Sequence, residues 1–384
     1  MTFESELDEL RSHALLRQLR EIGSPQQTVV KIGERKLVNF SSNDYLGLAT
    51  EPALREAAKR AIDEYGTGSG ASRLVCGTLS PHARLEARLA EFKRTEAALT
   101  FSSGYAAAVG TLGALAHRDD VIILDKLCHA SLLDGARLSG AHLRVFPHNH
   151  LGKLESHLRW AREHFPDARV IVATESVFSM DGDRAALAEI VKIKRRYDAL
   201  LLLDEAHAVG VIGSHGRGLA DHLGLGAEVE IQMGTLSKSL GNSGGYICGS
   251  RALVDLLINR ARSFIYSTAP PPAVAAAAEA AVEFLMSPAG EERRQLLVKN
   301  IGHFSRELGA RFGEERKAQS AIIPIVLGTS EAALYAARVL LEKGFLVPAI
   351  RYPTVARDAA RLRVTLCARH TPEQITALCH ALPL

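Results

Sequence analysis

An alternation of short apolar runs with helical segments begins near residue 97 and constrains the fold more than any other feature of the sequence. Each run is rich in β-branched residues or leucine, and the segment after it has the apolar spacing of an amphipathic helix. Strands that alternate with helices form a parallel sheet, and their nearly continuous apolar character indicates that helices cover both faces. The expected strands are residues 97–101, 120–125, 142–146, 169–176, 199–204, 231–235 and 244–250.

The chain of 384 residues exceeds the size at which one hydrophobic core usually stops growing, about 250–300 residues. A Ser-Pro-Ala-Gly stretch at 287–290 predicts a domain boundary. We expect an N-terminal helix and extended segment over 1–45, a large three-layer α/β domain over 46–286, and a smaller α+β domain over 287–384. The elements expected in the last domain are a helix over 290–313, a strand over 321–328, a helix over 331–343, strand pieces over 345–350 and 361–366, and a helix over 371–382.

Composition and charge exclude several classes of protein. Hydrophobic residues make up 47% and charged residues 23% of the chain, so the composition gives no reason to expect disorder. The net charge of +3, without a long block of like charge, is not that of a dedicated nucleic-acid binder. The most apolar helical segment, 273–286, carries two glutamates and is too short to cross a bilayer. We therefore expect small-molecule partners, without nucleic acid or membrane.

The sequence also favours a cytoplasmic protein without a metal site. Residues 1–13 are acidic and lack the basic start and apolar stretch of a signal peptide. The five cysteines are scattered and form no CxxC pair, which argues against a disulfide framework and a zinc site. The stretch His148-Asn149-His150 has no carboxylate or cysteine beside it in the sequence, and it indicates a polar loop.

Asp204 and His207 follow a buried strand directly, where ligands bind in open parallel sheets. An aspartate in that place is about equally suited to capping a turn. The string Asp-Glu-Ala-His also resembles the ATP-binding box of helicases, which work together with a GxxxxGK[ST] phosphate loop. That loop is absent, because Ser237 stands before Lys238 where the loop needs glycine, and Gly234 is too close to be its first glycine.

Lys238 follows another expected strand, within a segment of small and hydroxyl residues. The strand would lead this lysine into the ligand crevice, and no acidic residue stands beside it in the sequence. A partly desolvated lysine loses its proton more easily and suits Schiff-base chemistry. An ordinary solvated lysine is the alternative for any single lysine.

Two further strand ends carry polar or aromatic residues. Ser103-Gly104-Tyr105 lie between a strand and a helix, where backbone N–H groups can bind a phosphate. Tyr105 could equally be a packing aromatic. His129 follows the strand at 120–125, where its ring could stack on an aromatic ligand or be a core histidine.

Three arginines near the C-terminus, Arg351, Arg361 and Arg363, could hold a carboxylate by bidentate pairing. Most arginines near strands are simply solvated. Each of the three is therefore only a candidate.

Taken in order, these segments resemble the α-oxoamine synthase family of pyridoxal-phosphate enzymes, which share the fold of aspartate aminotransferase. The resemblance runs nearly from end to end of the chain, with departures at Ser237 and Ala356. It is carried by residues 39–48, 66–78, 102–110, 129–141, 174–183, 204–218, 234–241, 266–272 and 351–366.

The resemblance implies pyridoxal phosphate as the cofactor of the large domain. Lys238 would bind it covalently, and Asp204 would pair with its pyridine nitrogen. Ser267 and Thr268 would reach the phosphate held by the neighbouring subunit, which implies a homodimer with shared active sites. The other implied contacts are His129 stacked on the ring, His207 and Ser179 at its polar groups, and Gly104, Tyr105 and Thr235 holding cofactor or phosphate. The implied catalytic residues are Lys238, His129, Asp204 and His207.

The resemblance also implies a reaction. Lys238 would remove the α-proton of an amino acid, and the α-carbon would attack an acyl thioester with loss of carbon dioxide. Residues 349–355 are most similar to the branch that joins L-alanine to a pimeloyl thioester in biotin biosynthesis. The thioester could be on coenzyme A or on an acyl carrier protein. The implied substrate-binding residues are Asn43 and Arg363 for a carboxylate, Arg351 for the distal pimeloyl carboxylate, and Arg17, His129 and Thr354.

Two alternatives stay open at this point. Other members of the family use glycine or another acyl thioester, as 2-amino-3-ketobutyrate ligase and 5-aminolevulinate synthase do. A non-catalytic binding subunit with the same fold is the alternative from a different class. Such subunits usually lack the Schiff-base lysine, whereas Lys238 is present here.

Overall fold

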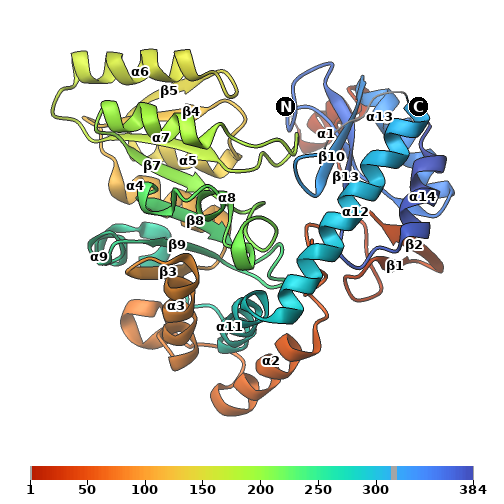
Figure 1. Ribbon diagram of the computed structural model, residues 1–384, viewed down its shortest axis with the longest axis horizontal. Helices are drawn as coiled ribbons and strands as arrows, with labels where there is room; N and C mark the ends of the chain where they lie inside the picture. Colours follow the sequence, from red (N-terminus) through yellow and green to blue (C-terminus); the bar gives the residue numbers. More distant parts are fainter. Residues whose placement is uncertain (1, 313–317, 384) are drawn as a thin grey trace. The chain divides into compact units, whose positions relative to one another are not determined.

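The computed structural model describes residues 2–312 and 318–383, which divide into two compact units (Figure 1). The large unit comprises Leu48–Ser179 and Asp183–Arg294, and the small unit comprises Met1–Gly47, Met180–Gly182 and Gln295–Leu384. The expected domain boundaries followed residues 45 and 286, whereas the units meet along the chain after Gly47 and after Arg294, and the small unit also includes Met180–Gly182. Gly313, at the end of an expected helix, and Met1 and Leu384, at the ends of the expected domains, lie outside the described residues.

The large unit is built on a seven-stranded sheet with the order β3-β9-β8-β7-β6-β4-β5. Strands β8, β7, β6, β4 and β5 are parallel, whereas β9 is antiparallel to both its neighbours. This sheet confirms the predicted α/β class, and each expected strand is present to within one residue at either end. The strands are β3 (Ala97–Phe101), β4 (Val121–Asp125), β5 (His142–Phe146), β6 (Val170–Glu175), β7 (Leu200–Asp204), β8 (Ile231–Thr235) and β9 (Gly245–Gly249).

Helices cover both faces of this sheet, so the unit has three layers (Figure 1). Ile122 and Leu124 of β4 pack in a core with α4, α5 and α9, whereas Val121 and Ile123 pack in a second core with α6 and α7. The helices of the large unit are α2 (Pro52–Tyr65), α3 (Ser80–Lys93), α4 (Gly104–Leu115), α5 (Ala130–Ser139), α6 (Leu151–His164), α7 (Leu187–Arg196), α8 (Leu219–His222), α9 (Arg251–Arg260), α10 (Arg262–Ile265) and α11 (Pro272–Met286), with short turns at Arg73–Gly77, Ser214–Gly216 and Gly226–Glu228.

The apolar segment expected over 273–286 is helix α11, whose buried face is mostly alanine. Proline near its start is favourable, because the first helical N–H groups have no partner within the helix. Within residues 2–312 and 318–383, no helix combines the length and the apolar character that spanning a bilayer would need.

A buried ion pair stabilises the loop after β7. The Glu205 carboxylate accepts hydrogen bonds from Lys93 Nζ at 2.5 Å and from the Ala220 amide at 3.1 Å. Lys93 also donates to the carbonyl of Arg217. A Cβ at Gly218 would lie 2.5 Å from this carboxylate, and the φ of Gly218 is +116°. Glycine is therefore required where the loop passes Glu205.

The small unit contains two three-stranded sheets, β1-β2-β11 and β10-β13-β12. Their strands are β1 (Val29–Ile32), β2 (Arg35–Asn39), β10 (Ile322–Gly328), β11 (Phe345–Leu346), β12 (Ala349–Ile350) and β13 (Ala360–Thr365). The helices are α1 (Phe3–Ser12), α12 (Pro288–Phe312), which crosses the boundary between the units along the chain, α13 (Ser330–Glu342) and α14 (Pro372–Ala381). These elements confirm the predicted smaller α+β fold.

The N-terminal segment belongs to the same unit as the C-terminal part, because β2 pairs in parallel with β11. The strand piece expected over 345–350 is two short strands that serve different sheets. Phe345–Leu346 pair with β2, and Ala349–Ile350 pair with β13. Pro348 lies between them and has no N–H group to donate to either sheet.

His370 is buried in the small unit and lies 4.1 Å, centroid to centroid, from the ring of Phe40. Its Nδ1 accepts from the amide of Cys367 at 3.0 Å, and its Nε2 faces the carbonyl of Asn39 at 3.0 Å. Nε2 must donate to that carbonyl, so this arrangement fits the neutral ring. Burial lowers the pKa of His370 to about 4, although the Asn39 carbonyl opposes the shift.

We predict that His370 stays neutral in the folded protein down to about pH 4, whereas it becomes charged in the unfolded chain below about pH 6.5. Because the unfolded chain then binds more protons, this histidine lowers the free energy of unfolding as the pH falls from about 6.5 to 4. Exchange of the histidine C2 hydrogen with deuterium, followed by mass spectrometry, measures this pKa. A pKa of His370 near 6.5 in the folded protein would contradict the prediction.

Candidate active site

A pocket of about 230 Å³ lies at the carboxyl ends of the strands in the large unit. This edge is where parallel strands bring together polar residues that are far apart in the sequence. The pocket unites most of the predicted cofactor residues of this unit. It is lined by Ser103, Gly104, Tyr105, His129, Ser131, Glu175, Asp204, Ala206, His207, Met233, Thr235, Ser237 and Lys238.

Asp204 is the last residue of β7 and is buried, as is His207 in the turn after it. The amide of Ala206 donates to the Asp204 carboxylate at 2.9 Å. Burial raises the pKa of Asp204, whereas the charge of Lys238 acts in the opposite direction. The sheet thus holds a carboxylate and an ammonium group within electrostatic reach of each other.

Lys238 lies in the connection between the antiparallel strands β8 and β9. The connection is closed by hydrogen bonds from the Leu236 amide to the Gly244 carbonyl, at 2.9 Å, and from the Gly241 amide to the Lys238 carbonyl, at 2.8 Å. A Cβ at Gly241 would lie 2.3 Å from the Ala49 amide nitrogen. The backbone around the lysine is therefore short, closed and tightly packed.

Glu175, which the sequence analysis did not select, ends β6 and lines the same pocket. Its carboxylate accepts from the His129 amide at 2.6 Å and from the Ser179 amide at 3.2 Å. Burial raises the pKa of Glu175 to about 8, with a further contribution from Asp204. The rule that selected Asp204, a polar residue at the carboxyl end of a buried strand, would also have found Glu175.

His129 caps the N-terminus of α5, and its Nδ1 lies 2.8 Å from the hydroxyl of Ser131. Burial lowers the pKa of His129, against the attraction of Asp204. The imidazole is therefore biased towards its neutral form beside the pocket. A neutral flat ring can stack on an aromatic ligand without adding charge.

The start of α4 provides donors for an anion. The Ser103 hydroxyl caps the helix by accepting from the Ala106 amide at 3.0 Å. The amides of Gly104 and Tyr105 belong to the first helical turn, whose N–H groups have no acceptor within the helix. Thr235 Oγ1 bonds the Gly244 carbonyl at 2.8 Å and lies 3.5 Å from where a Cβ of Gly104 would be. A phosphate-sized anion is well suited to this corner.

The other predicted cofactor residues lie outside the lining of this pocket. The Ser179 amide bonds Glu175, and Ser179 is buried beside the pocket. Thr268, which follows Ser267, forms an isolated bridge with Ser72. The contacts predicted for Ser267 and Thr268 belong to a neighbouring subunit, so these residues stay predictions.

The small unit brings several predicted substrate residues to a second pocket of about 710 Å³, lined by Arg17, Arg351 and Thr354 together with apolar side chains of α13. The Arg17 guanidinium donates to Thr354 Oγ1 at 3.2 Å, and Arg351 donates to the carbonyl of Leu16 at 3.4 Å. Burial and the charge of Arg17 lower the pKa of Arg351. Arg17 and Arg351 thus share with two further arginines, Arg20 and Arg338, a partly apolar cavity that suits an anion.

Arg361 and Arg363 have different surroundings within the small unit. The buried Arg363 donates to Asn43 Oδ1 at 3.1 Å, so the two predicted carboxylate-binding residues are in contact. Arg361 pairs with Asp181 at 2.6 Å and also donates to the carbonyl of Met180. Its guanidinium is occupied by a protein carboxylate, so Arg361 has a structural role.

Comparison with known proteins agrees with this geometry. The model of the family "Aminotransferase class I and II" matches residues 35–382. The chain is 48% identical to 8-amino-7-oxononanoate synthase from Geobacter sulfurreducens, over 95% of this chain and 93% of that protein.

Solved structures agree as well. Serine palmitoyltransferase from S. paucimobilis with bound PLP–myriocin superposes with a TM-score of 0.92 at 29% identity, over 98% of this chain and 95% of that one. For 8-amino-7-oxononanoate synthase from Francisella tularensis the TM-score is 0.76 at 31% identity, over 89% and 96% of the two chains. The chain therefore belongs to the aminotransferase class I and II family.

Proposed function

We propose that the chain catalyses the decarboxylative condensation of L-alanine with a pimeloyl thioester, which yields 8-amino-7-oxononanoate, carbon dioxide and a free thiol in biotin biosynthesis. The observation that carries this proposal is the pocket that unites Lys238 with the buried Asp204 at the carboxyl edge of the sheet. The nearly full-length similarity to 8-amino-7-oxononanoate synthases supports the choice of substrates.

The residues of the large-unit pocket fit pyridoxal phosphate. They offer an amine for its aldehyde, a buried carboxylate for its pyridine nitrogen, a flat ring for its face and helix amides for its phosphate. When bound, this cofactor supplies an electron sink for the negative charge that develops at the α-carbon of the amino acid. We assign these four contacts to Lys238, Asp204, His129 and the start of α4.

The protein side of the chemistry follows from the charges. An Asp204 carboxylate paired with a pyridine N–H keeps that proton in place, because the neighbouring charge favours the charged forms of both groups. A neutral His129 would stack on the cationic ring without repelling it. Lys238, close enough to be affected by Asp204, is the base that takes the α-proton. His207 and Ser179 would orient the ring through its polar groups.

The arginines of the small unit suit the two carboxylates of the substrates. A cavity with apolar walls and the cations Arg17 and Arg351 fits a methylene chain that ends in a carboxylate. Arg363 and Asn43, which contact each other, would bind the carboxylate of alanine. Thr354, bonded to Arg17, would keep that guanidinium in place.

We further propose a homodimer in which Ser267 and Thr268 contact the phosphate held by the partner. The exposed ring of Tyr266, next to them in sequence, would be covered in such a dimer. The pimeloyl group would be delivered by coenzyme A or by an acyl carrier protein. We expect the enzyme to act in the cytoplasm, because its five cysteines are free thiols, as in reducing compartments.

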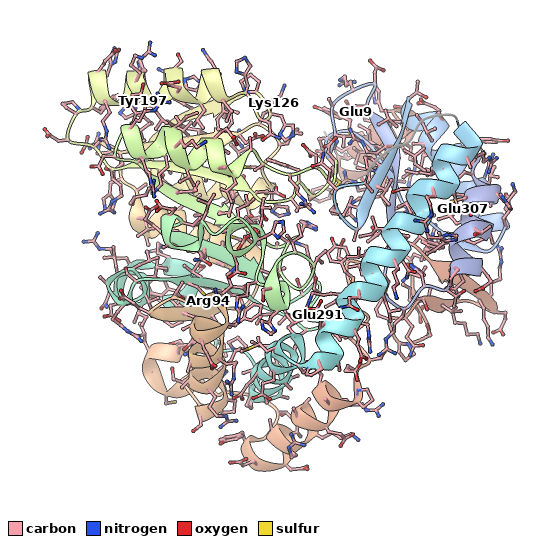
Figure 2. All side chains as sticks on the ribbon, viewed as in Figure 1. Glu9, Arg94, Lys126, Tyr197, Glu291 and Glu307 are labelled. Atoms are coloured by element: carbon pink, nitrogen blue, oxygen red, sulfur yellow. The ribbon has the colours of Figure 1, made fainter. Side chains whose placement is uncertain are left out.

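We predict that Lys238→Ala lowers turnover of L-alanine and pimeloyl thioester at least about 10³-fold, because the variant lacks both the covalent anchor and the base. The exposed Lys126, labelled in Figure 2, provides a matched control. Lys126→Ala should keep wild-type turnover and the visible absorption band of the bound cofactor. Turnover by Lys238→Ala within about tenfold of the wild type would refute the proposed mechanism.

Titration of the cofactor-loaded protein with amino acids, followed by visible absorption, tests the choice of amino acid. We expect L-alanine to saturate the spectral change at a concentration at least about tenfold lower than glycine, since one methyl group in a fitted pocket is worth about 10–200-fold. A preference for glycine would instead identify a synthase of the glycine-using branch. A protein that shows no cofactor band at all would indicate a non-catalytic subunit.

Arg351→Gln tests the choice of acyl group. We predict a KM for the pimeloyl thioester about 10–100-fold higher, with the KM for alanine unchanged, because a charged hydrogen bond to the distal carboxylate is lost. The exposed Arg357, which lies over the ring of Tyr352, gives the control variant Arg357→Gln. If a thioester of equal length without the distal carboxylate loses as much activity with Arg351→Gln, this role of Arg351 is wrong.

A further inference from the structure

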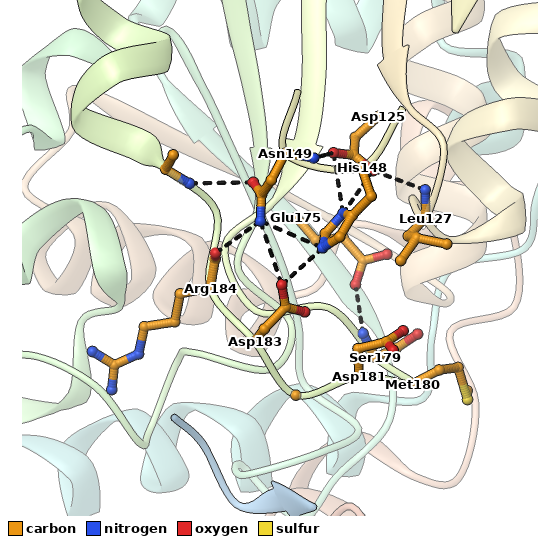
Figure 3. A network of polar contacts seen from close by, with 12 residues as sticks. Asp125, Leu127, His148, Asn149, Glu175, Ser179, Met180, Asp181, Asp183 and Arg184 are labelled. Carbon is orange, nitrogen blue, oxygen red and sulfur yellow. Dashed lines mark hydrogen bonds and ion pairs between the residues drawn. The ribbon is translucent and has the colours of Figure 1, made fainter. Parts of the chain in front are cut away.

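A cluster of charged side chains in the large unit lies next to the candidate active site (Figure 3). We call Asp125, His148, Asn149 and Asp183 the His148 cluster. Its histidine and asparagine come from the stretch that the sequence analysis interpreted as a plain polar loop. None of the four lines the pocket.

Asp125 controls the turn that leads to His129. Its carboxylate accepts from the amide of Leu127 at 2.8 Å, and its carbonyl accepts from the amide of Cys128 at 3.1 Å. The turn places His129 at the start of α5. A second oxygen of Asp125 accepts from the amide of Asn149 at 2.8 Å, which fixes the 148–149 loop to the end of β4.

Asp183 belongs to the loop that carries Ser179. The loop is closed like a hairpin, with a bridge between Val177 and Arg184 and a hydrogen bond from the Phe178 amide to the Asp183 carbonyl at 3.0 Å. The Asn149 amide group donates to the Arg184 carbonyl at 3.1 Å. The 148–149 loop is thereby hydrogen-bonded to the 183–186 end of the loop that carries Ser179.

His148 lies between these two parts of the chain. Its Nδ1 is 3.1 Å from Asp125 Oδ1 and its Nε2 is 2.7 Å from Asp183 Oδ2, while its ring meets Phe178 edge-on at 4.3 Å. Two ring nitrogens that both face carboxylates must both donate, which describes an imidazolium. Burial opposes this charge, but the two carboxylates outweigh it and raise the pKa of His148 to about 10.

Glu175 joins the same two turns on the pocket side, through the amides of His129 and Ser179. The two turns are therefore connected twice: by the Glu175 carboxyl group, which accepts from one amide of each turn, and by the His148 ring, which faces one carboxylate of each turn. Within the described residues, no cluster of His, Cys, Asp and Glu has the arrangement of a metal site.

We propose that His148 is a positioning residue, whose imidazolium joins the turn carrying His129 to the loop carrying Ser179 and so fixes His129 at the pocket and Ser179 beside it. The importance of these two residues for ligand binding rests on the proposed function. If glutamine replaces His148, its neutral side-chain amide can donate a hydrogen bond to one of the two carboxylates. The other carboxylate is then left without a counter-charge.

The test uses the full-length, cofactor-loaded protein with His148→Gln. Amide hydrogen exchange followed by mass spectrometry should show at least about tenfold faster exchange in both 126–131 and 176–186, and unchanged exchange in β1 and β2 of the small unit. The dissociation constant of pyridoxal phosphate should rise about tenfold, with the KM of the acyl thioester unchanged. Faster exchange in only one of the two segments, or an unchanged dissociation constant, would overturn the proposal.

His150→Asn is the matched control, because His150 is exposed and its Nδ1 caps α6 by accepting from the Lys153 amide, which asparagine can also do. It should behave as the wild type in both measurements. A measurement on the wild type keeps the proposal testable if His148→Gln does not fold. Histidine C2 exchange should show His148 still protonated at pH 8.5, and a pKa near 6.5 would overturn the proposal.

Failure of this inference and failure of the proposed function give different results. A wild-type protein that does not bind pyridoxal phosphate would contradict the proposed function. The exchange rates of 126–131 and 176–186 would still decide whether His148 joins the two turns.

Discussion

Three neighbouring strands of the large unit each end in a buried carboxyl group, and the candidate site depends on how these three groups are stabilised. Asp125, Glu175 and Asp204 end β4, β6 and β7 and are 2%, 2% and 6% exposed. Buried carboxylates without partners are strongly destabilising. Each has a different partner: the imidazolium of His148, two backbone amides, and the ammonium of Lys238 with one amide. The lysine that the chemistry needs is thus also part of the electrostatic balance of the sheet.

Glu205, the residue after Asp204, forms a further buried ion pair in the core. Glu205 is paired with Lys93 of α3 and does not line the pocket. Within the string Asp-Glu-Ala-His, every residue except the glutamate lines the pocket, and the glutamate holds the loop that passes Gly218 and Ala220. The string therefore combines a site with the support of the loop that follows it.

Most of the fold could be predicted because the strands of the large sheet are buried on both faces and appear as apolar runs. The strands β1 and β2 were missed, because they are short, partly exposed and rich in lysine and arginine. The pocket residues could be predicted wherever they follow a buried strand, although Glu175 was overlooked. The role of His148 could not be predicted from the sequence. Asp125 and Asp183 lie 23 and 35 positions away from it along the chain, and only the fold brings them to the same imidazole ring.

The connection between β8 and β9, which carries Lys238, differs from the connections between the parallel strands of the sheet. It joins two adjacent antiparallel strands directly, whereas the parallel strands are joined through helices. A helical crossover can gain or lose residues on the surface without moving the strands it joins. The closed backbone between β8 and β9 has no such freedom, because Gly241 packs against the chain at Ala49. An insertion or deletion in this connection would therefore shift Lys238, whereas exchanging side chains at constant loop length leaves the lysine in place.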